Sequence, residues 1–121
     1  MRNHEKDVYQ KLLGRAGERL TEKHYRKAGY EVLARNYRTP FGEADLIVKK
    51  NDTVVFVEVK TRTDESFGAP RDAVTRVKQE RYGKIALSYL QRARLENHFV
   101  RFDVAEVSDG AVNLLENAFF L

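Results

Sequence analysis

The chain has 121 residues, with 22 Lys and Arg against 18 Asp and Glu, and it contains no Cys. This length predicts one domain spanning residues 1–121, and the absence of Cys excludes a disulfide scaffold, a thiolate zinc site and a cysteine nucleophile. No apolar run approaches the roughly 20 residues that cross a bilayer, and the charged N-terminus lacks the apolar segment of a secretory signal. We therefore expect a cytoplasmic protein without a membrane partner.

The first half of the chain predicts a long helix followed by three strands. Apolar and small residues recur at spacings of three and four between residues 5 and 28, and Gly29 is suited to end that helix. A short apolar run at residues 30–36 predicts a strand, and the turn signal Thr39-Pro40-Phe41-Gly42 follows it. Two stronger strands are expected at residues 43–49 and 54–60.

The second half predicts one more helix and two more strands. Residues 64–69 are typical of a loop, and Pro70 suits the first turn of a helix that runs to about Ala93. Alternating apolar residues predict a strand at 99–107, and a weaker strand is expected near 112–115. The order α-β-β-β-α-β-β predicts an α/β fold with a central mixed β-sheet flanked by helices.

The two strong strands are predicted to form an antiparallel hairpin with its tip at Asn51-Asp52. In that register Leu46 faces Val57 and Val48 faces Val55, and Ala44 and Val59 continue the same aliphatic face. A slip of one residue would place these aliphatic side chains opposite charged ones, so the pattern selects this register.

The second face of this hairpin brings two carboxylates together. Asp45 falls opposite Glu58, Glu43 falls opposite Lys60, and Ile47 and Phe56 complete the row. Opposed carboxylates repel unless a cation lies between them, and a divalent cation such as Mg²⁺ accepts hard oxygen ligands of this kind. A solvated face with a Glu43–Lys60 ion pair is the alternative, although it does not explain Asp45 opposite Glu58.

Asp45 followed by Glu58-Val59-Lys60 resembles the D…(D/E)-x-K core of the restriction-endonuclease-like nucleases. The wider pattern resembles the bacterial YraN family, also called UPF0102, which is similar to archaeal Holliday-junction resolvases. The matching segments extend over nearly the whole chain. They are Gly14-Arg15-Ala16-Gly17-Glu18, Gly29-Tyr30, Arg35-Asn36, Gly42-Glu43-Ala44-Asp45-Leu46-Ile47, Phe56-Val57-Glu58-Val59-Lys60-Thr61-Arg62, Arg101-Phe102-Asp103-Val104 and Asn117-Ala118-Phe119.

The resemblance implies a restriction-endonuclease-like fold with a metal-dependent catalytic site. Asp45, Glu58 and the Val59 carbonyl are the expected ligands of Mg²⁺ or Mn²⁺, and Glu18 is implied to reach the cation directly or through water. The Lys60 ammonium would orient a water or stabilise charge on the phosphate, which gives four catalytic candidates: Glu18, Asp45, Glu58 and Lys60.

Residues around this site are candidates for contacts with nucleic acid. Thr61 and Arg62 follow it directly and would hold a phosphate, since arginine binds phosphate oxygens in a bidentate manner. Lys78 and Gln79 resemble residues that related nucleases present towards their active sites, and a solvated helix face is an equal alternative for them. Glu43 is either a partner of Lys60 or an occasional ligand.

The resulting hypothesis is a Mg²⁺-dependent endonuclease that hydrolyses phosphodiester bonds in DNA. Residues 1–94 carry 21 basic and 13 acidic side chains, which favours a phosphate-bearing partner. The resolvase resemblance suggests branched or structured DNA, a role in repair or recombination, and a homodimer. The alternatives are a non-catalytic nucleic-acid-binding module that keeps the nuclease fold, and an adaptor for other proteins.

Overall fold

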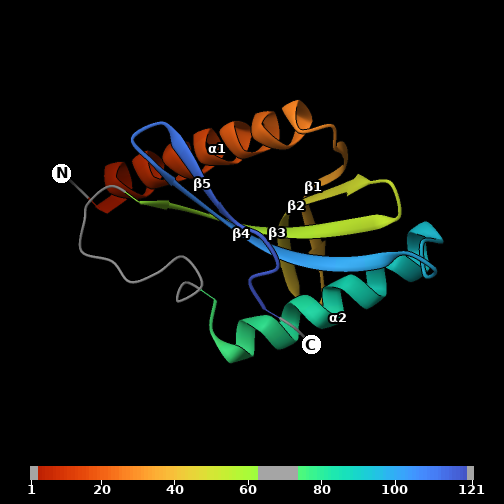
Figure 1. The fold of residues 1–121 in the computed structure, drawn as a ribbon. Helices are drawn as coiled ribbons and strands as arrows, with labels where there is room; N and C mark the ends of the chain where they lie inside the picture. Colours follow the sequence, from red (N-terminus) through yellow and green to blue (C-terminus); the bar gives the residue numbers. More distant parts are fainter. Residues whose placement is uncertain (1–2, 63–73, 120–121) are drawn as a thin grey trace.

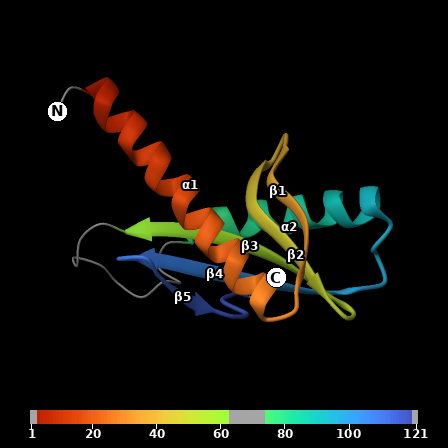
Figure 2. The same cartoon turned by 90° about the horizontal axis from the view of Figure 1, so that it is seen from above.

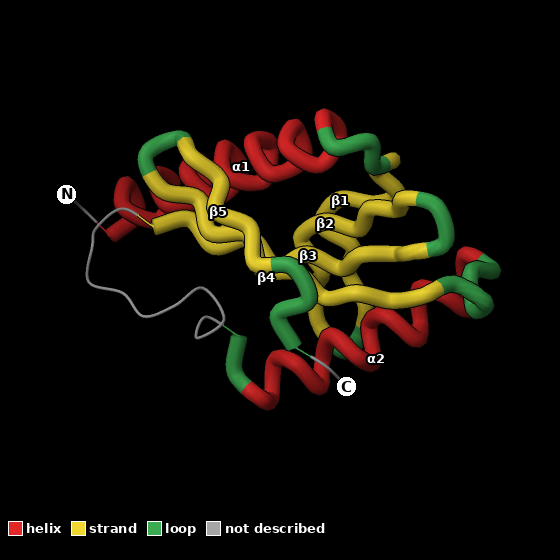
Figure 3. Tube along the Cα trace, in the orientation of Figure 1, coloured by secondary structure: helices red, strands yellow, loops and turns green. Residues whose placement is uncertain are grey.

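A computed structural model describes residues 3–62 and 74–119 of the chain, with side chains described from residue 5 onward (Figures 1 and 3). The predicted α/β class and the α-β-β-β-α-β-β order are confirmed. The elements are α1 (Asn3–Lys27), β1 (Glu31–Thr39), β2 (Gly42–Lys50), β3 (Thr53–Arg62), α2 (Arg76–Ala93), β4 (Phe99–Ser108) and β5 (Ala111–Leu115).

The five strands form one mixed sheet in the order β1-β2-β3-β4-β5. Neighbouring strands are antiparallel except β3 and β4, which are parallel and are therefore joined by a crossover that contains α2. The helices α1 and α2 cover opposite faces of the sheet (Figure 1). In the described part of the chain, neither helix combines the length and apolar character that crossing a membrane requires.

Two element boundaries differ from the sequence prediction. β1 continues through Thr39, where Thr39 pairs with Gly42 across the turn that was predicted there. α2 begins at Arg76 rather than near Pro70, because the Thr75 hydroxyl accepts a hydrogen bond from the Lys78 amide at 3.2 Å and caps the helix. Pro70 itself lies outside the described residues.

The core on the α1 face is built on aliphatic residues of the hairpin. Leu46, Val48, Val55 and Val57 are buried there against Tyr25 of α1. At Gly17 the helix approaches β3 so closely that a Cβ would overlap the Thr61 hydroxyl. A glycine at this position therefore permits the close approach of α1 to β3.

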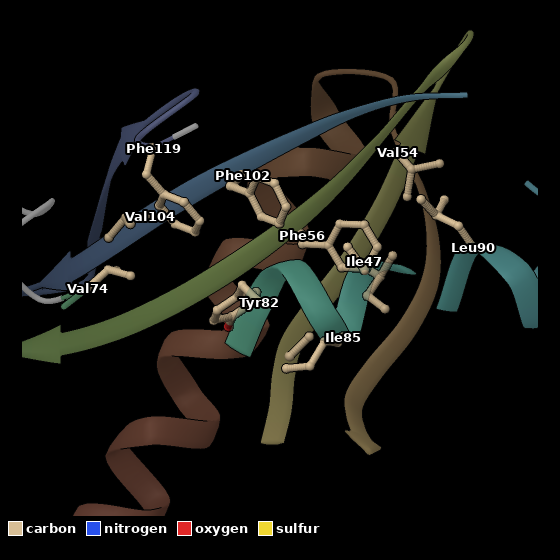
Figure 4. Packing of buried hydrophobic residues seen from close by; sticks show 12 residues of the cluster. Ile47, Val54, Phe56, Val74, Tyr82, Ile85, Leu90, Phe102, Val104 and Phe119 are labelled. Atoms are coloured by element: carbon tan, nitrogen blue, oxygen red, sulfur yellow. The ribbon is translucent and has the colours of Figure 1, made fainter. Parts of the chain in front are cut away.

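The core on the α2 face is the larger of the two and is rich in aromatic residues (Figure 4). Phe56 stacks on Phe102 with ring centroids 5.9 Å apart, and Ile47 is fully buried in the same cluster. Both faces of the hairpin are therefore packed by helices, including the face on which Ile47 and Phe56 lie.

The predicted hairpin register is confirmed between its tip and the pair Leu46–Val57. Beyond that pair the two strands have no ladder pairing, so Ala44–Val59, Asp45–Glu58 and Glu43–Lys60 are not cross-strand partners. Ala44 belongs to the α2-side core instead of the aliphatic face predicted for it. The strands separate at Asp45, the residue from which the candidate site is built.

Candidate active site

Asp45 takes over a backbone hydrogen bond where β2 and β3 separate. Its Oδ2 accepts a hydrogen bond from the Val59 amide at 2.8 Å, so the side chain satisfies a donor that the ladder no longer pairs. This bond fixes Asp45 beside β3 although the backbones have diverged. Asp45 and Glu58 therefore remain neighbours, as the register predicts, but through a side chain instead of a ladder pair.

The carboxylate pair is electrostatically unfavourable as it stands. Burial, the charge of Glu58 and, more weakly, Glu18 raise the pKa of Asp45 to about 8, and the Val59 amide only partly opposes this rise. Glu58 is itself 8% exposed. The pKa of the buried Tyr82 is raised by burial and by the same two carboxylates. Ionising both acids here is costly unless a cation is present.

Lys78 supplies a cation from α2. Its Nζ lies 2.9 Å from Glu58 Oε2, and that oxygen has no hydrogen-bond partner of acceptable geometry among the described residues. Gln79 does not join it, because its Nε2 donates to the Val74 carbonyl at 3.2 Å at the start of the helix. The structure thus brings Lys78 to the carboxylates and leaves Gln79 apart.

Glu18 approaches the pair from α1 without completing a cluster. Its Oε1 accepts a hydrogen bond from Asn36 Nδ2 at 3.2 Å, and Asn36 adopts the left-handed conformation (φ 47°) that Asn tolerates. In residues 3–62 and 74–119, no three Asp, Glu or His side chains gather closely enough to form a metal site by themselves. Glu18 therefore acts on Asp45 through its charge but stands outside the pair.

Lys60 and Glu43 do not form the ion pair considered from the sequence. Glu43 Oε2 lies 3.3 Å from Arg38 Nε, across the β1–β2 pairing. Lys60 is exposed, lines a groove together with Glu18 and Val59, and has no ion pair with any described residue. Its ammonium is available to a ligand.

Thr61 and Arg62 are held by the protein itself. The Arg62 Nε lies 3.0 Å from Glu106 Oε2, and the arginine side chain is only 8% exposed. The Thr61 hydroxyl donates to the Leu13 carbonyl at 3.5 Å, although Thr61 also lines the groove beside Lys60. Of the two predicted phosphate contacts, Arg62 does not present its guanidinium to solvent.

Sequence reasoning missed a group of arginines beside Asp45. Arg15, Arg19 and Arg35 line a hollow of about 470 Å³ whose wall includes Asp45 and Glu18. All three are exposed, and Arg35 in addition binds Glu22 in a bidentate manner. The signal in the sequence was the spacing of four between Arg15 and Arg19, which places both on the helix face beside Glu18.

These features define an α/β protein with an incompletely neutralised carboxylate pair at a point where two strands of a mixed sheet separate. The chain belongs to the family described as "Uncharacterised protein family UPF0102", whose model matches residues 17–107. It is similar to the UPF0102 protein of Caldicellulosiruptor saccharolyticus, with 42% identity over 113 residues that cover 88% of this chain and 96% of the relative. The UPF0102 proteins of Desulfosudis oleivorans (45% identity, 88% of each chain) and Alkaliphilus metalliredigens (44%, 90% and 98%) are similar too.

Proposed function

We propose that the protein is a metal-dependent endonuclease that hydrolyses phosphodiester bonds in DNA. The observation that carries this proposal is the pair Asp45 and Glu58, two acids held together where burial and mutual repulsion disfavour their charges. Such a pair opposes folding unless its charge is neutralised, and closely held carboxylates are ligands that a divalent cation binds.

The donor set fits a small divalent cation. The carboxylates of Asp45 and Glu58 and the carbonyl of Val59 would hold Mg²⁺ or Mn²⁺, because all three offer hard oxygen ligands. Once bound, such an ion polarises a phosphate and lowers the pKa of a water molecule. The Asp45 carboxylate is already oriented for this role by the Val59 amide.

One lysine and two arginines would contact phosphate groups, and a second lysine balances a carboxylate of the site. Lys60, exposed beside Val59, would orient the attacking water or stabilise the charge that builds on the phosphate. Lys78 places its ammonium beside Glu58 and balances the charge of that carboxylate. Arg15 and Arg19 line the hollow beside Asp45 and would contact neighbouring backbone phosphates, which positions DNA without reading its sequence.

The resemblance to Holliday-junction resolvases makes branched or otherwise structured DNA the proposed substrate, with a role in repair or recombination and a homodimer as the acting form. A non-catalytic nucleic-acid-binding module is the second candidate. It is favoured by the Lys78–Glu58 ion pair, which neutralises one acid without metal, and by the lack of a third acid in the cluster within the described residues.

Cleavage of a labelled panel tests the proposal. Single-stranded, duplex, flap and four-way-junction DNA, together with RNA, would be incubated with the protein in Mg²⁺, Mn²⁺ or EDTA. We expect metal-dependent cleavage that Asp45→Asn lowers by at least about 100-fold, since even residues that only support metal ligands can matter by 10- to 100-fold. Asp52→Asn, the same substitution at the exposed hairpin tip, should cut like the wild type.

Metal-dependent cutting that survives Asp45→Asn would contradict the proposed site. Metal-independent binding of DNA, with no cutting of any substrate in either metal, would favour the binding module instead.

A further inference from the structure

The N-terminal half of α1 forms one wall of a groove that opens beside the carboxylate pair. Figure 2 shows these first turns of α1 lying clear of the strands. The groove has a volume of about 800 Å³. Its helix wall consists of Lys6, Tyr9, Gln10, Leu13, Gly14 and Glu18, and its other wall of Val59, Lys60 and Thr61 at the end of β3.

The groove residues continue the helix face that packs the core. Their spacing of three and four leads on to Gly17, Thr21 and Tyr25, which are buried against the sheet. Where α1 extends beyond the strands, the same helix face lines the groove instead of the core. Tyr9 there is 52% exposed, and a Cβ added at Gly14 would meet no atom of the described residues within 4 Å. The groove is therefore open, with an aromatic ring at its side.

The chemistry of the groove is that of a nucleotide site. A tyrosine ring offers a stacking surface that any base can use, and Leu13 extends its apolar wall. Lys6 and Lys60 bring two ammonium groups, and the Gln10 amide both donates and accepts hydrogen bonds. A volume of about 800 Å³ is sufficient for a nucleotide, given that ligand pockets span roughly 300–1,000 Å³.

We propose that this groove binds an unpaired nucleobase next to the phosphate at the carboxylate site, with the base stacked on Tyr9. The inference rests on the proposed nuclease function, because Val59 and Lys60 belong both to the groove and to that site. Lys6 and Lys60 contact the phosphates on either side of the base. A base inside a duplex must first leave its stack, so the preferred substrates carry unpaired nucleotides at the cut.

Binding without cleavage tests the groove. In EDTA, fluorescence anisotropy would compare a single-stranded oligonucleotide of about 12 nucleotides with the corresponding duplex. A second probe, the same strand with one 2-aminopurine, reports stacking through its fluorescence. We expect the single strand to bind more tightly, and Tyr9→Ala to weaken this binding about tenfold or more and to abolish the change in 2-aminopurine fluorescence.

Three further variants separate stacking from general damage. Gly14→Leu places a side chain in the groove, and leucine is a residue that helices favour. This variant should weaken single-strand binding to a similar extent. Tyr9→Phe keeps the ring and should bind within about twofold of the wild type. Leu12→Ala, exposed on the same helix outside the groove, should also bind within about twofold. Circular dichroism would verify folding.

The groove proposal is overturned if Tyr9→Ala and Gly14→Leu both bind the single strand like the wild type, or if the wild type does not bind it. Because no chemistry enters this assay, its failure is distinct from failure of the nuclease proposal. If the protein cuts DNA but its single-strand binding does not depend on Tyr9, the nuclease proposal is supported and the groove proposal is rejected. If the protein cuts no substrate but its single-strand binding depends on Tyr9, the groove proposal is supported and the nuclease proposal is rejected.

Discussion

Two buried acids on neighbouring strands, Asp103 of β4 and Glu58 of β3, are treated in opposite ways by the fold. In the parallel register Asp103 pairs with Val57 and Glu58 pairs with Val104, so the acids are one step apart and lie on opposite faces of the sheet. Asp103 has no exposed surface and Glu58 is 8% exposed, so burial alone does not distinguish them.

The Asp103 carboxylate is saturated with donors. Arg101 donates from Nε to one oxygen and from Nη2 to the other, both at 2.9 Å. The Tyr25 hydroxyl donates a further hydrogen bond at 2.6 Å, and the backbone amide of Asn117 donates another at 2.9 Å. These partners come from α1, β4 and the segment after β5, so this acid ties distant parts of the chain together.

At the pair Asp45 and Glu58, the Val59 amide donates to Asp45 and the Lys78 ammonium lies beside Glu58. Four donors bind the single carboxylate of Asp103, whereas Asp45 and Glu58 are two acids placed side by side. Buried polar groups are normally satisfied, and exceptions cluster where a protein binds something. Asp103 is thus satisfied within the fold, whereas burial and the charge of Glu58 raise the pKa of Asp45.

The largest expected effect is the loss of stability on removing the Asp103 charge. Asp103→Asn removes the main counter-ion of the partly buried Arg101 and leaves, among the described residues, only Glu116 Oε1, 3.9 Å from Arg101 Nη2; breaking a buried pair destabilises a protein by about 3–5 kcal/mol. Urea denaturation at neutral pH would measure it, with Asp109→Asn in the exposed β4–β5 turn as the matched control. A loss below about 1 kcal/mol would mean that Asp103 is not the structural acid of this comparison.

The next effect is stabilisation of the wild type by a divalent cation. A ligand that binds only the folded state adds about 2.7 kcal/mol when its concentration is 100 times the dissociation constant. Thermal unfolding in increasing Mn²⁺ or Mg²⁺ should therefore show a rising Tm. In Asp45→Asn the rise should be largely lost, and in Asp109→Asn it should be kept. Equal shifts in all three chains would place the cation elsewhere.

A smaller effect is expected without metal, and its sign distinguishes the two acids. Asp45→Asn replaces an acid whose ionised form is disfavoured by burial and by Glu58 with a neutral group, and the asparagine oxygen can still accept from the Val59 amide, so the variant should be more stable by about 1 kcal/mol. Urea denaturation in EDTA at neutral pH would measure it. Destabilisation by more than about 1 kcal/mol would make Asp45 a structural acid like Asp103.

Hydrophobic periodicity was sufficient to predict the element order and the hairpin register, and the register alone brought Asp45 near Glu58. It could not predict that the strands separate there, or that the Val59 amide donates to the Asp45 side chain in place of a ladder partner. Nor could it predict the partner of Arg62, since Glu106 is brought to it by the parallel pairing of β3 with β4.

The saturation of Asp103 was equally invisible in the sequence. Tyr25 and Asp103 are separated by 78 positions, and no local pattern connects them. The groove was more accessible, because Lys6, Tyr9, Leu13 and Gly14 follow helical spacing. Periodicity gives the helix face on which these residues lie, but it does not indicate that α1 extends beyond the sheet at these positions.

The smallest effect concerns a third kind of acid, one that is neutralised at the surface. Glu22 of α1 accepts hydrogen bonds from Arg35 Nε at 2.5 Å and Arg26 Nε at 3.0 Å, and the Arg35 bond is the main reason that the pKa of Glu22 falls from 4.5 to about 2. A lowered pKa means that the ionised acid stabilises the fold above about pH 4.5 and that this contribution disappears as the pH falls towards 2.

Glu22→Gln should therefore lower the free energy of unfolding by about 1 kcal/mol or less at pH 7, because water and salt screen such pairs. The urea denaturation curves of variant and wild type should converge between pH 4.5 and pH 2, and a difference that stays constant over this range would show that Glu22 acts through packing instead of charge.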